Sequence, residues 1–214
     1  MLVAEKRPSL RLLTPSQFPQ RNDEEQIEKV LSIFEDSARA HRAMVEAGAE
    51  TVVAMARIVT DCFRKGGKVL FFGNGGSAAD AQHAAAELMG RFNRDRDPLP
   101  ALSLATDTSV LTCVGNDYEY DEIFARQVRG LARPGDVVIG LSTSGNSENV
   151  ARALAAARQI GAQALALTGE RGRAVGHASD LCLTVPSGST PRIQELHILA
   201  LHTLCDLVEA DLFG

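Results

Sequence analysis

The chain has 214 residues, 45% of them hydrophobic, and a formal net charge of -5 at pH 7. This length is sufficient for one compact domain with a sizeable core. The acidic balance and the lack of a basic cluster speak against nucleic-acid and membrane partners, and no apolar run reaches the roughly 20 residues that a membrane-spanning helix needs.

The first residues differ in character from the rest. Residues 1–24 hold arginines and prolines with little periodicity, and Glu5 and Pro8 interrupt the pattern of a targeting peptide. We expect a poorly ordered or arm-like extension at 1–24 and a single domain over 25–214. The cysteines stand singly in apolar segments without a C-x-x-C motif: Cys62, Cys113, Cys182 and Cys205. This pattern predicts buried free thiols in a cytoplasmic protein.

Hydrophobic periodicity predicts the order of helices and strands. Two amphipathic helices are expected at 24–48 and 49–67, with Gly48 and Gly66–Gly67 as stops. Apolar runs then predict strands at 68–73, 100–105, 136–142, 162–168 and 180–186. Helices are expected between them, at 77–91, 109–114, 121–132 and 146–160. A last helix is expected to begin near Thr190 as N-cap, with Pro191 at its first position. Together these elements indicate an α/β fold, a five-stranded parallel sheet flanked by helices.

Ligands of such folds bind beyond the carboxyl ends of the strands, where a glycine-rich loop, GNGGS at 73–77, opens a helix. Its glycines permit close approach of a ligand, and the helix start favours an anion. The pattern Gly73-x-Gly75-x-x-Ala78 also fits the loose dinucleotide fingerprint, which expects an acidic residue about 20 positions on. The nearest acidic residue at the end of a predicted strand, Asp107, lies well beyond that spacing. We therefore do not expect a dinucleotide-binding site. No Gly-Lys-Ser/Thr follows to indicate a nucleotide P-loop.

A second loop, STSGNS at 142–147, follows the third predicted strand and also opens a helix. Hydroxyl donors and helix N–H groups can bind a phosphate monoester without a lysine. Serines and asparagine are also ordinary helix caps and loop residues. Because four hydroxyls fall within six residues here, we favour phosphate.

Two of the predicted helices carry side chains that could bind a metal or transfer protons. His83 and Glu87 are four residues apart and share one helix face, where they are either an exposed pair or metal ligands. The surrounding residues are small and apolar, which favours a functional role. The last helix carries Gln194, His197 and His202 among many aliphatic residues. One such histidine is normally a core residue, but two beside a glutamine are less readily explained in that way.

Four segments resemble the phosphoheptose isomerases, which are sugar-isomerase (SIS) domain enzymes: GNGGSAADAQHAAAELMGRF, CVGNDYEYDEIFARQV, GDVVIGLSTSGNSENV and RIQELHILALHTLCDLVE. The resemblance covers most of the chain from about residue 25. It implies a single SIS domain and a homotetramer with active sites at subunit interfaces. It also implies conversion of D-sedoheptulose 7-phosphate to D-glycero-D-manno-heptose 7-phosphate through a cis-enediol, in heptose precursor biosynthesis.

The resemblance also implies roles for individual residues. The family's zinc ligands fall on His83, Glu87, Gln194 and His202. Glu87 and His202 match its acid–base pair. Some members have an aspartate where this chain has Pro191, so we assign no role there. The family's substrate contacts fall on Asn74, Gly75, Gly76, Ser77, Glu87, Asn116, Asp117, Ser142, Thr143, Ser144, Ser147 and Gln194.

Helix geometry constrains the last two ligands. Gln194 and His202 are eight residues apart, which is roughly 12 Å along a helix and about 80° around its axis. Either their side chains converge on one ion, or more than one chain contributes to the site. Spacing alone pairs Gln194 with His197, and we follow the resemblance in expecting His202. Such a set of donors suits Zn²⁺ and is also compatible with manganese or nickel.

Two other functions are consistent with the same fold. Certain SIS proteins are non-catalytic adaptors that bind a replication initiator and have lost metal-site residues, whereas this chain retains them. A phosphosugar-sensing module would need the phosphate loop without an acid–base pair, which is present here. We therefore favour an aldose–ketose isomerase.

Overall fold

The computed structural model describes residues 22–214. The chain divides into two compact units, Met1–Glu35 and Asp36–Gly214. Helix α1 (Asp23–Arg64) begins in the first unit and continues into the second, which contains the sheet. Most of the extension expected at 1–24 therefore lies outside the described residues. None of the helices in the described part combines the length and apolar character that a membrane crossing requires.

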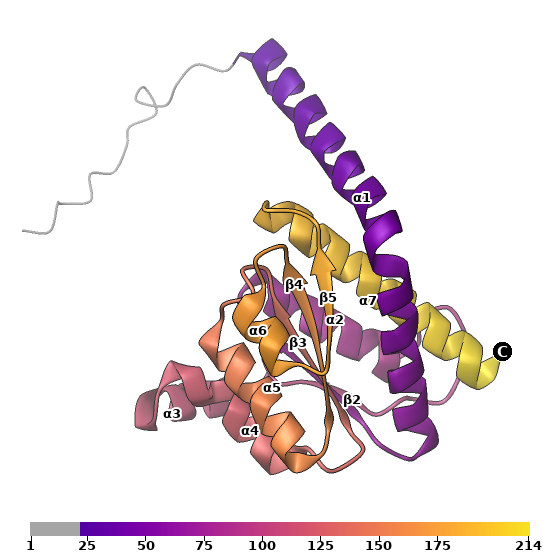
Figure 1. Cartoon of the computed structure of the whole chain (residues 1–214), viewed down its shortest axis with the longest axis vertical. Coiled ribbons are helices and arrows are strands. Elements are labelled where there is room, and N and C mark those ends of the chain that lie inside the picture. Colours follow the sequence, from indigo (N-terminus) through magenta and orange to yellow (C-terminus); the bar gives the residue numbers. More distant parts are fainter. Residues whose placement is uncertain (1–21) are drawn as a thin grey trace, which may run out of the picture. The chain divides into compact units, whose positions relative to one another are not determined.

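A five-stranded parallel sheet is the centre of the second unit (Figure 1). Its strands are β1 (Val69–Gly73), β2 (Ala101–Ser103), β3 (Val137–Ser142), β4 (Gln163–Gly169) and β5 (Leu181–Val185). They are ordered β2-β1-β3-β4-β5. The helices that follow α1 are α2 (Gly76–Met89), α3 (Thr108–Asp117), α4 (Ile123–Leu131), α5 (Glu148–Ile160), α6 (Arg173–Ala178) and α7 (Thr190–Phe213), with a short 3₁₀ helix η2 (Tyr120–Glu122).

Each face of the sheet is covered by its own layer of helices. Helices α2 and α7 and the part of α1 from Ala40 onward share one apolar core with alternate residues of the sheet, including Phe71 and Ile139. Helices α4 and α5 share the other core with the intervening strand residues, including Phe72 and Val138. Burial on both faces explains why the strands are continuous apolar runs, as the sequence predicted.

Several local predictions are corrected by the structure. The two N-terminal helices expected at 24–48 and 49–67 are one helix, α1, and Gly48 lies inside it. Gly48 packs against Met44, where a Cβ would lie 2.3 Å from the methyl carbon, so close packing explains this glycine better than a helix stop. Helix α6 was not predicted. The N-cap of α7 is Ser189 rather than Thr190.

The cysteines are free, but not all of them are buried. Cys62 and Cys205 lie in the core, whereas Cys113 is exposed and Cys182 is half-buried. The prediction of four buried thiols is therefore wrong for these last two residues.

Candidate active site

The direction in which strands are added to the sheet reverses between β1 and β3. The chain leaves β1 to form β2 on one side and then crosses to form β3 on the other. Gly73 at the end of β1 pairs with Leu141, the residue before the end of β3. The glycine-rich loop and the serine-rich loop therefore start side by side at the carboxyl edge of the sheet. This is the position at which open α/β sheets bind ligands.

The glycine-rich loop leads directly into α2. Gly75 has φ +57°, a conformation that glycine adopts readily and other residues rarely do. The Asn74 side chain exchanges two amide hydrogen bonds with Asn149, of 2.9 and 3.0 Å, and its oxygen accepts a third from the Tyr120 hydroxyl at 3.0 Å. Asn74 is thus engaged within the protein. Helix starts leave N–H groups free for an anion, and at this start the Ser77 side chain is buried.

The serine-rich loop is ordered by its own hydroxyl groups. The buried Ser142 hydroxyl lies 2.8 Å from that of Ser147 and accepts a hydrogen bond from the Gly145 N–H at 3.1 Å. The exposed Ser144 hydroxyl accepts from the Asn146 N–H at 3.3 Å. Gly145 has φ +66°. These contacts hold the loop in a tight turn at the start of α5.

Three potential metal ligands converge where α2 lies beside α7. The His83 Nε2 atom is 3.0 Å from Glu87 Oε1 and 3.0 Å from His202 Nε2. One ligand atom from each residue lies within 4.8 Å of the others. His83 is exposed, and Glu87 and His202 are half-buried. The ring of Phe92 packs against His202, with centroids 5.5 Å apart.

The donors fit a divalent metal. Two imidazole nitrogens and one carboxylate oxygen are common ligands of zinc, at bond lengths of about 2.0–2.2 Å. A tetrahedral ion with such bonds needs its donors roughly 3.4 Å apart, which is close to the 3.0 Å separations found here. The three residues can therefore hold a metal within one chain.

Other predicted residues lie elsewhere. The Gln194 amide packs against Gly76, so that a Cβ on this glycine would lie 2.2 Å from the amide nitrogen. That position is about 10 Å from His83 along α2, so a role as fourth ligand requires either a different conformation of Gln194 or the Gln194 of another subunit. Asn116 and Asp117 are exposed at the end of α3, where the Asn116 amide donates to the Asp117 carboxylate at 2.9 Å.

His197 is a core residue. It is fully buried, and burial lowers its pKa to about 4, although the Thr168 backbone acts in the opposite direction. The imidazole is therefore neutral at pH 7. His197 is not one of the three residues of the metal-binding group, so the pairing with Gln194 that spacing alone suggested is not found.

The structure adds residues that the sequence did not indicate. Asp80 has a buried carboxylate oxygen without a hydrogen-bond partner among the described residues. Burial raises the pKa of Asp80, and the charge of His83 opposes this. Its spacing of three residues from His83 could have identified it. The Tyr120 and Asn149 contacts to Asn74 join three separate segments, and no sequence signal indicated them.

Known proteins resemble this chain over most of its length. A family model described as SIS domain matches residues 33–169. A phosphoheptose isomerase from Aquifex aeolicus is 54% identical over 183 residues, which are 86% of this chain and 96% of that protein.

Two solved structures agree with this similarity. A phosphoheptose isomerase from Neisseria gonorrhoeae has a TM-score of 0.82 and 44% identity, covering 86% of this chain and 99% of that one. A phosphoheptose isomerase from Francisella tularensis has a TM-score of 0.84 and 37% identity, and the match covers 86% of this chain and 98% of that one. The chain belongs to the phosphoheptose isomerase family of SIS-domain proteins.

Proposed function

We propose that this protein converts D-sedoheptulose 7-phosphate to D-glycero-D-manno-heptose 7-phosphate. The observation that carries the proposal is the convergence of His83, Glu87 and His202 near an anion-binding type of loop. A phosphate site and an acid–base or metal-binding group joined by one helix suit an enzyme that isomerises a sugar phosphate. The names of the relatives give the substrate class.

The phosphate group would bind at the carboxyl edge of the sheet. Hydroxyl groups and the start of α5 offer donors there, and the start of α2 adds more. From Ser77 to His83 is about 9 Å along α2, so the spacing favours a substrate with several carbons between phosphate and carbonyl. Binding one end would position the reacting carbons. The residues assigned to the phosphate are Ser77, Ser142, Thr143, Ser144 and Ser147.

The chemistry is a proton transfer between neighbouring carbons. In the forward direction, a base removes a proton from C1 of the ketose while the C2 carbonyl oxygen gains one, which gives a cis-enediol. A proton is then returned to C2, and the C1 hydroxyl loses its proton to become the aldehyde. We assign these proton transfers to Glu87 and His202, whose ligand atoms lie within 4.8 Å of each other.

Zinc is the metal that we assign to His83, Glu87 and His202, with Gln194 as the proposed fourth ligand. When bound, it would supply Lewis-acid polarisation of a substrate oxygen. The two imidazoles would hold it between α2 and α7, and the half-buried position of Glu87 limits access of bulk water to that carboxylate. We place the protein in the cytoplasm.

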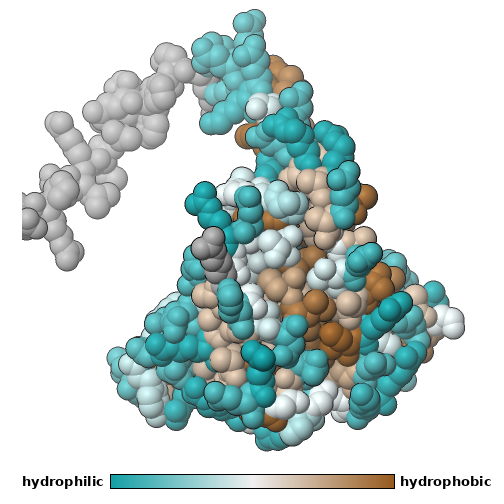
Figure 2. Space-filling view, in the orientation of Figure 1, coloured by the Kyte–Doolittle hydropathy of each residue, from teal (hydrophilic) through white to brown (hydrophobic). Residues whose placement is uncertain are grey.

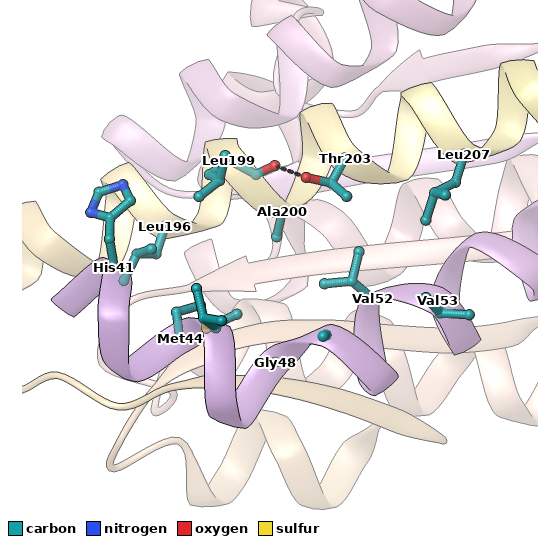
Figure 3. A pocket seen from close by; sticks show the side chains of 12 residues that line it. His41, Met44, Gly48, Val52, Val53, Leu196, Leu199, Ala200, Thr203 and Leu207 are labelled. Atoms are coloured by element: carbon teal, nitrogen blue, oxygen red, sulfur yellow. Dashed lines mark hydrogen bonds between the residues drawn. The ribbon is translucent and has the colours of Figure 1, made fainter. Parts of the chain in front are cut away.

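We propose a homotetramer with sites at subunit interfaces. An apolar groove of about 360 Å³ runs between α1 and α7 (Figure 3), and Val45 on its border is 74% exposed. Apolar atoms also gather on the face seen in Figure 2. Apolar patches of this kind are typical of association surfaces, and a second copy of the chain is the occupant we propose. Groove residues include Met44, Gly48, Val52, Leu196, Leu199 and Ala200.

One assay tests the function. Purified protein is incubated with sedoheptulose 7-phosphate as isolated, after chelation, and after zinc is added back. We expect turnover that the chelator abolishes and zinc restores. Full turnover by metal-free protein would remove the metal from the mechanism. Stable binding to a replication initiator without turnover would favour the adaptor function instead.

A further inference from the structure

Residues 91–97 form a turn that follows α2 in the chain and makes hydrogen bonds to α7. These are the two helices that carry the metal-binding group. Helix α2 bears Glu87, and α7 bears His202. The side chains of the turn reach both helices. The segment is outside the residues that the family resemblance assigned to the site.

A buried ion pair fixes this turn to α7. Arg96 Nε donates to Glu209 Oε1 at 2.9 Å, and the two side chains are only 1% and 0% exposed. Glu209 also accepts hydrogen bonds from the N–H groups of Phe92, Asn93 and Arg94, at 2.8, 2.8 and 3.0 Å. Burial alone would raise the pKa of Glu209, but these donors and Arg96 hold it below its usual value. The carboxylate is therefore charged and fully bonded.

The same arginine holds the last turn of α2. Its guanidinium donates to the carbonyl oxygens of Glu87 at 3.0 Å and Leu88 at 2.8 Å. A planar guanidinium can reach these carbonyls and Glu209 together, which a lysine could not do. Arg96 thereby links the backbone of Glu87 to Glu209 of α7. Glu209 lies about two helical turns after His202 on the same helix.

Phe92 contacts both this buried ion pair and the imidazole of His202. Its N–H is held by Glu209, and its ring packs against that of His202 at a centroid distance of 5.5 Å and an interplanar angle of 32°. The ring limits the rotation of His202. We propose that Arg96, Glu209 and Phe92 are positioning residues that hold Glu87 and His202 in the geometry needed to bind the metal. This inference rests on the proposed metal group, and not on the identity of the sugar.

The test measures metal affinity, which is independent of turnover. Glu209→Gln keeps the shape of the side chain and removes its charge. We expect the zinc dissociation constant, from competition with a chromophoric chelator, to rise by about tenfold or more, as is common when outer residues of a metal site are changed. The visible spectrum of the Co²⁺-substituted protein should change as well, since it reports ligand geometry.

Asp136→Asn is the matched control. Asp136 is also buried, pairs with Lys68 at 2.6 Å, and accepts N–H bonds from Lys68 and Arg133. It lies just before β3, at the opposite edge of the sheet from the loops. We expect this variant to lose stability in urea without a change in metal affinity. Equal loss of affinity in both variants would overturn the proposal, since a general loss of stability would then explain it.

Phe92→Leu decides the outcome if Glu209→Gln does not fold. It leaves the ion pair intact and removes only the aromatic contact, so a weaker affinity and an altered Co²⁺ spectrum are expected. Wild-type behaviour of this variant would overturn the role of Phe92, and wild-type affinity of both variants would overturn the whole proposal. A wild-type protein that binds metal normally but does not isomerise the sugar would defeat only the proposed function.

Discussion

Glu87 and Ser144 belong to the two ends of the proposed site, and their substitution should have different effects. Glu87→Gln keeps the size of the side chain and removes a proton acceptor that lies 3.0 Å from His83. We expect turnover to fall by about 100-fold or more, while calorimetry still detects binding of the sugar phosphate. Metal content must be measured in the same sample. Near-normal turnover would exclude Glu87 as an acid–base residue.

Ser144→Ala should act on binding. The Ser144 hydroxyl is exposed in the serine-rich loop, and a hydrogen bond to a charged group contributes about 1.5–3 kcal/mol. We expect the affinity for sedoheptulose 7-phosphate to fall by roughly tenfold or more. The control is unphosphorylated sedoheptulose, whose binding should not change. Equal weakening for both ligands would show that the loop is not a phosphate site.

His197 should make stability depend on pH. Its pKa is about 4 in the folded protein and about 6.5 when unfolded, so the unfolded chain binds more protons below pH 6.5. The free energy of unfolding should therefore fall as pH drops from about 6.5 to 4, by up to about 1.4 kcal/mol per pH unit. Above this range His197 contributes no pH dependence.

Urea unfolding at several pH values measures this effect. His197→Gln should flatten the curve between pH 6.5 and 4, relative to the exposed control His177→Gln. Other groups titrate in both variants alike, so only the difference is interpreted. Identical slopes in the two variants would contradict the neutral buried state of His197.

The sequence alone could not show which of the two histidines of α7 is buried in the core and which lies beside α2. His197 and His202 are five residues apart, roughly 140° around the helix axis. Because α7 is apolar on nearly all sides, its pattern does not reveal which side faces the sheet and which faces α2. The two potential metal ligands His83 and Glu87 were detectable because both lie on one helix.

The strands of the sheet were predictable from the sequence, whereas the continuity of the first helix through Gly48 was not. Strands buried on both faces are continuous apolar runs, so all five were placed within about one or two residues. A glycine within a helix costs only about 1 kcal/mol relative to alanine, and the contact of Gly48 with Met44 is invisible in a sequence. Helix α6 has six residues, too few to show a period.

The serine-rich loop should be sensitive to a methyl group at Gly145. A Cβ there would lie 1.9 Å from the Cα of Gly172, so backbone must move against backbone. Gly145→Ala should lower the free energy of unfolding by more than the roughly 1–2 kcal/mol that a left-handed conformation alone costs. It should also weaken binding of the sugar phosphate.

Gly135→Ala provides the comparison for this prediction. Gly135 also has a positive φ, of 89°, but no atom lies within 4 Å of its Cβ position. Urea unfolding of both variants separates the conformational cost from the clash. An equal decrease in the free energy of unfolding in both variants would mean that the close approach of Gly172 adds nothing to the cost of Gly145→Ala.

The protein is expected to assemble as a tetramer. Light scattering should give a tetramer, and Val45→Asp should shift it to smaller species, because a charge at the apolar groove between α1 and α7 opposes association. Leu131→Asp is the control, since Leu131 is 40% exposed on α4, on the other face of the sheet. An active monomer would defeat the proposal.

Mixing inactive subunits tests the composition of each site. Glu87 and His202 meet within one chain, so mixtures of Glu87→Gln and His202→Ala subunits should remain inactive after exchange. Mass spectrometry would verify the exchange. Recovered activity would show that the two residues of one site come from different chains, an arrangement that the sequence alone left open.

The position of α7 links assembly of the metal-binding group to a late step in the folding of the chain. His83 and His202 are 119 residues apart in the chain, and α7 leaves the ribosome after all five strands of the sheet. Until it packs, Leu196, Leu201 and Leu204 are missing from the core that covers one face of the sheet. A nascent chain therefore lacks both a covered sheet and the second imidazole. A chain in which α7 has not yet packed should accordingly bind the proposed ion much less tightly than the folded protein does.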